Sequence, residues 1–115
     1  METHLSHSNF KPTILHQNEV GQISQCEECG EITIMIKSIM FFCNVDLLKD
    51  IRKMVSSITS RIDNHIYIIN DEQKVVLCTI HDNVKLCFTV EEMLDLNELL
   101  DQSLHMIEVN KLLFN

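Results

Sequence analysis

A chain of 115 residues is long enough for one domain but too short for two independent hydrophobic cores. Its composition, 45% hydrophobic and 23% charged, is that of a globular protein and excludes a disordered or fibrous one. The formal net charge of −8, with nine lysines and arginines spread along the chain, excludes the basic surface that drives binding to nucleic acids and to anionic membranes.

The compartment is indicated by what the sequence lacks. No stretch approaches the roughly 18–20 apolar residues needed to cross a membrane, and the polar N-terminus with Glu2 is unlike a signal peptide. Five cysteines are an odd number for a disulfide framework. We therefore expect a cytoplasmic protein with reduced thiols, in which residues 1–12 form a flexible tail and residues 13–115 a single domain.

The first predicted elements are two strands joined by a cysteine turn. A strand over residues 20–25 leads into Cys26-Glu27-Glu28-Cys29-Gly30. Isoleucine at every second position then predicts a half-buried strand over residues 32–37. The two strands are expected to form a hairpin with the cysteines at its tip.

A wholly apolar strand and a helix follow. Residues 39–43 are apolar throughout, which predicts a strand covered on both faces. Asn44 can accept a hydrogen bond from a free amide of the next turn and so begin a helix. Apolar residues recur at three- and four-residue steps over residues 45–62, which predicts an amphipathic helix there.

The second half repeats this order. Strands are predicted over residues 66–69, 75–80 and 84–88, the first two joined by the polar turn 70–73. Thr89 and Glu92 have the spacing of a capping box, and apolar residues from Met93 to Ile107 predict a second helix.

These elements predict an α+β fold, with an antiparallel sheet and two helices packed on one of its faces. The segment from Phe42 to Asp46 aligns with the segment from Cys87 to Glu91. A duplicated β-β-α half would explain this match. Independent use of the same capping chemistry at two strand-to-helix junctions would explain it equally well.

The cysteine turn carries the most specific chemistry in the sequence. Cys26 and Cys29, two apart at a hairpin tip, can point at one tetrahedral zinc ion, and Gly30 permits the left-handed turn that follows. A closed structural site needs four ligands, and the chain has no second Cys-x-x-Cys. The weaker candidates for the missing ligands are Cys78 with His81, and His16. Cys78 can equally be a small buried hydrophobe.

A thiol redox enzyme or redox sensor using Cys26 and Cys29 is the alternative function. In such enzymes the first cysteine lies at a helix N-terminus, which lowers its pKa. Here a strand pattern follows the motif, and the neighbouring Glu27, Glu28 and Glu31 would raise the thiol pKa. With no catalytic grouping elsewhere in the sequence, we expect a non-enzymatic binding or interaction protein, with zinc at the turn as its candidate cofactor.

The C-terminal residues indicate a partner. Leu112, Leu113 and Phe114 place three large apolar groups at the end of the chain. Such groups need a surface to cover them. We expect a protein partner or a homodimer, with the homodimer favoured.

The sequence resembles a family of small bacterial proteins, found mostly in Bacteroidota, that carry a domain of unknown function. The resemblance rests on Ile14-Leu15-His16-Gln17, Gly21-x-Ile23, Cys26-x-x-Cys29, the strand into Phe41-Phe42 and the helix after it. It implies no activity, substrate or partner. It also implies no second cysteine pair, which weakens a four-ligand zinc site, and it gives no support to Cys78, His81 or Gly30.

Overall fold

The computed structural model describes residues 12–79 and 81–114. The predicted tail, apart from Pro12, lies outside the described residues. The elements follow in the order β1 (Pro12–Gln17), β2 (Gly21–Cys26), β3 (Ile32–Ile36), β4 (Ile39–Cys43), α1 (Val45–Ser60), the short 3₁₀ helix η2 (Ile62–His65), β5 (Ile66–Ile69), β6 (Glu72–Cys78), β7 (Lys85–Phe88) and α2 (Val90–Phe114).

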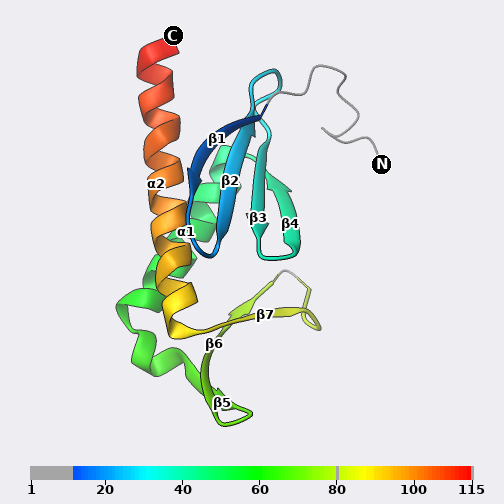
Figure 1. The fold of residues 1–115 in the computed structure, drawn as a ribbon, viewed down its shortest axis with the longest axis vertical. Coiled ribbons are helices and arrows are strands. Elements are labelled where there is room, and N and C mark those ends of the chain that lie inside the picture. Colours follow the sequence, from blue (N-terminus) through cyan, green and yellow to red (C-terminus); the bar gives the residue numbers. More distant parts are fainter. Residues whose placement is uncertain (1–11, 80, 115) are drawn as a thin grey trace.

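The strands form two antiparallel sheets, one of four strands in the order β1-β2-β3-β4 and one of three in the order β5-β6-β7 (Figure 1). This confirms the α+β class and the antiparallel pairing. The strands are divided between two sheets because α1 and η2 lie between β4 and β5 in the chain and separate β5 from β4. Each half is a run of antiparallel strands followed by a helix, but the first half has one strand more than the second.

Strand β1 was not predicted from the sequence. It pairs with β2, and its register shifts between Ile14 and His16, where a bulge turns Leu15 into the core. A bulge interrupts the alternation of buried and exposed residues that identifies a strand. Pro12 at its first position weakens the strand pattern further, since proline cannot donate to a ladder.

One glycine in a strand and one turn between strands require particular backbone geometry. At Gly21 a Cβ atom would collide with the carbonyl oxygen of Met35 on β3, so the close approach of these strands needs glycine. Asn70 and Asp71 both have positive φ, 53° and 64°, which gives a two-residue turn of the kind that joins hairpin strands. The tight turn lets β6 begin at Glu72, three residues before the predicted start.

Both helices begin where their capping residues predict. The Asn44 Oδ1 accepts a hydrogen bond from the Leu47 amide at 2.8 Å. The Thr89 amide donates to the Glu92 carboxylate at 2.8 Å, and the Glu92 amide donates to the Thr89 hydroxyl at 3.0 Å. Helix α2 continues past Ile107 to Phe114, which makes it about 37 Å long at 1.5 Å per residue. In the described part of the chain, neither helix combines the length and the apolar content needed to cross a membrane.

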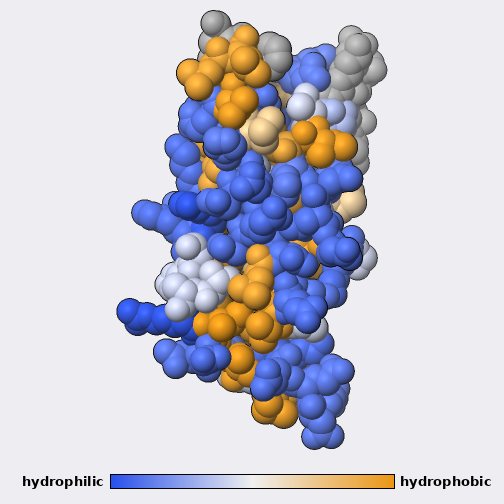
Figure 2. All heavy atoms as spheres, turned by 60° about the vertical axis from the view of Figure 1, so that its left-hand side comes forward, coloured by the Kyte–Doolittle hydropathy of each residue, from blue (hydrophilic) through white to orange (hydrophobic). Residues whose placement is uncertain are grey.

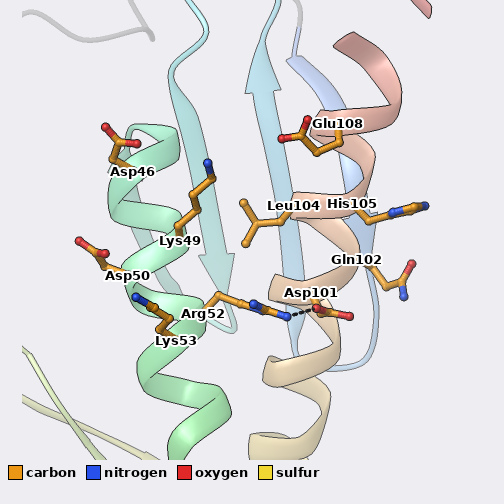
Figure 3. Close-up of a pocket in the computed structure, with 10 residues that line it drawn as sticks. All are labelled: Asp46, Lys49, Asp50, Arg52, Lys53, Asp101, Gln102, Leu104, His105 and Glu108. Carbon is orange, nitrogen blue, oxygen red and sulfur yellow. Dashed lines mark hydrogen bonds and ion pairs between the residues drawn. The ribbon is translucent and has the colours of Figure 1, made fainter. Parts of the chain in front are cut away.

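The two helices cover one face of the four-stranded sheet, and α2 also reaches the three-stranded sheet (Figures 1 and 3). It packs against β1 and β2 with one part of its length and against β6 and β7 with another. One continuous core joins the two sheets to both helices. Its members with essentially no exposed surface include Ile23, Ile32, Ile34, Leu48, Val55, Val75, Met93, Leu96, Leu99 and Leu100.

We predict that Leu100→Ala lowers the free energy of unfolding by about 2–5 kcal/mol, because the side chain is fully buried and its removal leaves a cavity. Leu94→Ala, on the half-exposed side of the same helix, should change it by no more than about 0.5 kcal/mol. Urea unfolding followed by circular dichroism measures both. Equal losses for the two variants would contradict the burial described for α2.

Candidate functional site

The cysteine turn joins β2 to β3 at the upper end of the four-stranded sheet in Figure 1. The Cys26 amide donates to the Glu31 carbonyl and the Gly30 amide to the Cys26 carbonyl, both at 2.9 Å. Gly30 has a φ of +78°, as expected from the sequence. The Cys29 amide lies 3.5 Å from the Cys26 sulfur and donates to it. The turn therefore has the compact backbone geometry that the Cys-x-x-Cys-Gly spacing predicts.

The two thiols of the turn differ in environment. Cys26 is only 3% exposed, whereas Cys29 is exposed. A backbone hydrogen bond from Glu31 acts to lower the pKa of Cys29, but the hydrogen bond with the Cys26 thiol, partial desolvation and the nearby charges outweigh it, so the pKa of Cys29 is raised. Burial, aided by the charge of Glu31, raises the pKa of Cys43 to about 11. Both groups are therefore protonated at neutral pH, which is unfavourable for a nucleophile.

The other predicted metal ligands lie away from this turn. Cys78 ends β6, and His81 follows in the segment that leads to β7, below the opposite end of the four-stranded sheet (Figure 1). Both are exposed. His16 lies opposite Ile23 in the pairing of β1 with β2, three residues, or roughly 10 Å, along β2 from Cys26.

No group of three or more His, Cys, Asp or Glu side chains among residues 12–79 and 81–114 is arranged to hold a metal ion. The cysteine turn offers two ligands, which does not fit a closed four-ligand zinc site. Zinc at Cys26 and Cys29 therefore stays a prediction from the spacing alone.

His16 instead belongs to a polar cluster that fixes the β1–β2 turn on α2. Its Nε2 lies 3.1 Å from both carboxylate oxygens of Glu98. The Asn18 amide nitrogen donates to Glu98 Oε1 at 2.7 Å and to the Asp95 carbonyl at 2.8 Å. The Asn18 side-chain oxygen accepts from the Val20 amide. Hydrogen bonding by Asn18, which has the larger effect, and by His16 lowers the pKa of Glu98.

An open groove of about 800 Å³ runs between α1 and α2 (Figure 3). Lys49, Arg52 and Lys53 line it from α1, and Asp101 and Glu108 from α2. Arg52 Nη2 lies 2.9 Å from Asp101 Oδ1, with both side chains about half exposed. A pair so exposed contributes at most about 1 kcal/mol. The groove is thus a charged, solvated seam between the helices, without a buried group that could do acid–base chemistry.

The end of α2 is the most exposed apolar part of the structure. Leu112 is 85% and Leu113 68% exposed. Figure 2 shows a hydrophobic group at this end of the molecule, above a largely hydrophilic helix surface. The structure therefore leaves the leucines that the sequence singled out open to solvent.

The sequence did not predict that His16, Asn18 and Glu98 form one cluster. Asn18 lies two residues from His16, but Glu98 lies 82 residues away. A single sequence does not indicate which residues so far apart in the chain are in contact. The only feature of the sequence that could have suggested this contact was the polar pair Asp95 and Glu98 beside the buried stripe of α2.

We predict that Cys29 is alkylated slowly at neutral pH and that its rate rises with a midpoint above the usual thiol value of 9.0, because its pKa is raised. Iodoacetamide labelling at a series of pH values, followed by peptide mass spectrometry, measures the midpoint. The exposed Cys78 in the same sample serves as an internal comparison. A Cys29 midpoint near neutrality would contradict the environment described and would favour redox chemistry.

The polar cluster predicts a pH dependence of stability. Because the pKa of Glu98 is lowered in the folded state, its stabilising effect is complete above its ordinary pKa of 4.5 and is lost as the pH falls through the lowered value. Glu98→Gln should remove this part of the pH dependence. Urea unfolding from neutral pH to about pH 3 measures it.

The control for this measurement is Glu108→Gln, which removes a carboxylate from the same helix that lies 3.8 Å from Lys111 in an exposed pair. It should leave the pH profile close to that of the wild type. A profile unchanged by Glu98→Gln would show that the ionisation of Glu98 contributes nothing to stability.

Comparison with known proteins adds one finding. Among curated proteins and among solved structures, none matches the chain. The sequence pattern of a family of unknown function, DUF6686, matches residues 9–114, which include every helix and strand described above. The chain therefore belongs to the DUF6686 family of unknown function.

Proposed function

We propose that the protein is a small non-enzymatic module that binds another protein through the C-terminal turn of α2. The observation that carries this proposal is the exposure of Leu112 and Leu113, 85% and 68%, at the end of a long helix. Large apolar side chains grouped on the surface are typical of interaction sites.

The energetics favour a binding role for these leucines. Burying a leucine side chain that is otherwise exposed is worth about 1.5–3 kcal/mol, so the pair can supply a substantial part of the affinity of a complex. The adjacent Lys111 and Glu108 are charged and exposed, as is usual at the rim of an interface. A helix presents the leucines in a fixed arrangement, which reduces the entropy lost on binding.

The alternative, a thiol redox enzyme, receives less support. It needs a reactive thiol at the Cys26–Cys29 turn, but Cys26 is buried and the pKa of Cys29 is raised. The five cysteines, all within the described residues, form no disulfide bond. We propose a reducing, cytoplasmic setting, which the odd number of cysteines in the sequence favours.

The double variant L112S/L113S tests the proposed surface. We predict that a discrete partner copurifies from the native host with the wild-type protein and is lost with the variant, because serine cannot replace the buried apolar contact. Quantitative mass spectrometry of the copurified proteins measures this.

The matched control is Q102S/H105S, which replaces two exposed residues on the same helix. It should retain the partner. Circular dichroism and the melting temperature must show that both variants are folded. An identical set of partners for L112S/L113S and the wild type would overturn the proposal.

A further inference from the structure

Two exposed cysteines share one face of the three-stranded sheet. Cys78 ends β6 and Cys87 lies in β7, the strand beside it in Figure 1, and both thiols are free and exposed. The buried Val75, Leu77 and Phe88 of the same two strands belong to the core that contains α2. Because side chains alternate along a strand, Cys78 and Cys87 both lie on the opposite, outer face of the sheet.

The pairing of β6 with β7 makes these cysteines diagonal neighbours. Its register is regular, with Cys87 opposite Val76 and Cys78 opposite Lys85. Each cysteine is therefore two positions away from the residue that faces the other. Diagonal neighbours lie about 7–8 Å apart, with their Cβ atoms somewhat closer. A disulfide requires Cα atoms about 4.4–6.8 Å apart, so the sheet holds the two thiols near each other but too far apart to join.

This spacing suits a single metal ion between the two sulfur atoms. With metal–sulfur bonds of about 2.3 Å, a linear arrangement of sulfur, metal and sulfur places the sulfurs about 4.6 Å apart. Two cysteine side chains on diagonal positions, about 7–8 Å apart, can reach that separation without a movement of the backbone. The outer face of the sheet thus presents two ligands at a spacing that an ion can bridge.

The number of ligands decides which ion fits. Across the residues that the structure describes, no group of three or more His, Cys, Asp or Glu could hold a metal. Zinc, which takes at least three protein ligands, therefore does not fit the pair. Thiolates are soft ligands that select copper(I), and copper(I) accepts two ligands in a linear arrangement.

The charge beside the pair also suits a thiolate complex. Copper(I) bound by two thiolates has a net charge of −1. Lys85 lies directly opposite Cys78 and so shares its face of the sheet. Its ammonium group donates to the Asp82 carbonyl, a neutral acceptor, at 3.2 Å. A positive charge next to the ligands favours the negatively charged complex.

We propose that Cys78 and Cys87 together bind one copper(I) ion. Each thiol releases its proton to water, and two copper–sulfur bonds form with no change of oxidation state. The site is separate from Leu112 and Leu113, which lie at the far end of α2 from β7. It is also separate from the turn at Cys26 and Cys29, where one of the two thiols is buried.

Anaerobic titration with copper(I), in competition with a coloured copper(I) chelator, measures the affinity of the site. The reference protein is the Cys29→Ser variant, in which the cysteine turn keeps only one thiol. Native mass spectrometry of this protein should show one copper ion on each chain of 13.4 kDa. A reference protein that retains no copper, or that shares one ion between two chains, would overturn the proposal.

Removal of either ligand tests the pair. In the reference protein, Cys78→Ser and Cys87→Ser should each lower the affinity for copper(I) by about a hundredfold or more, the gain expected from two linked contacts over one. Both side chains are exposed, so circular dichroism should show an unchanged fold. The matched control, Cys43→Ser in β4, should keep the affinity. An equal loss in this control, or full affinity without Cys78, would contradict a site at this pair.

Moving one thiol tests the diagonal geometry. K85C/C87S places the second thiol directly opposite Cys78, where Cα atoms lie about 4.5–5.5 Å apart. With oxidised glutathione, which is reduced to two glutathione molecules, this shifted pair should form a disulfide. At the same glutathione concentration the native pair should form no bond between its cysteines. Peptide mass spectrometry after alkylation measures both. A disulfide between Cys78 and Cys87 that forms as readily as the shifted one would overturn the proposed spacing.

Discussion

The structure depends on the buried face of α2. This one helix packs against strands of both sheets, and its buried residues between Met93 and Ile107 belong to the same core as Val75 and Phe88 of the smaller sheet. A three-stranded sheet has little stability without a surface to pack on. The capping box at Thr89 sets where that surface begins, and the cluster around Asn18 fixes the larger sheet to its middle.

Local chemistry made much of the fold predictable. Asn44 and the Thr89–Glu92 pair act within four residues, so their hydrogen bonds could be inferred from spacing and are present. The alternating isoleucines from Ile32 to Ile36 are buried as expected. What could not be predicted depends on distant parts of the chain. The bulge in β1 hides its alternation, and the division into two sheets follows from how α1 and α2 pack.

For the candidate site, too, the local geometry could be predicted from the sequence, whereas contacts with distant residues could not. The turn at Cys26 and Cys29 has the geometry that its spacing indicates, including the left-handed Gly30. Whether other ligands reach it depends on the tertiary fold, which places Cys78 and His81 near the other end of the sheet. His16 was a reasonable ligand from its position before the hairpin. Its partner is Glu98, and the sequence contains no sign of that contact.

The place of α2 in the chain has a consequence for biosynthesis. Both sheets precede the helix that completes their core, so on the ribosome seven strands are made before the surface on which they pack. Until α2 emerges, the apolar residues of β1, β2, β6 and β7 that it covers stay open to water and to other chains, a state prone to aggregation. Completion of the core is therefore delayed until this segment has been synthesised, and premature termination before residue 90 would leave an exposed sheet for chaperones and proteases to handle.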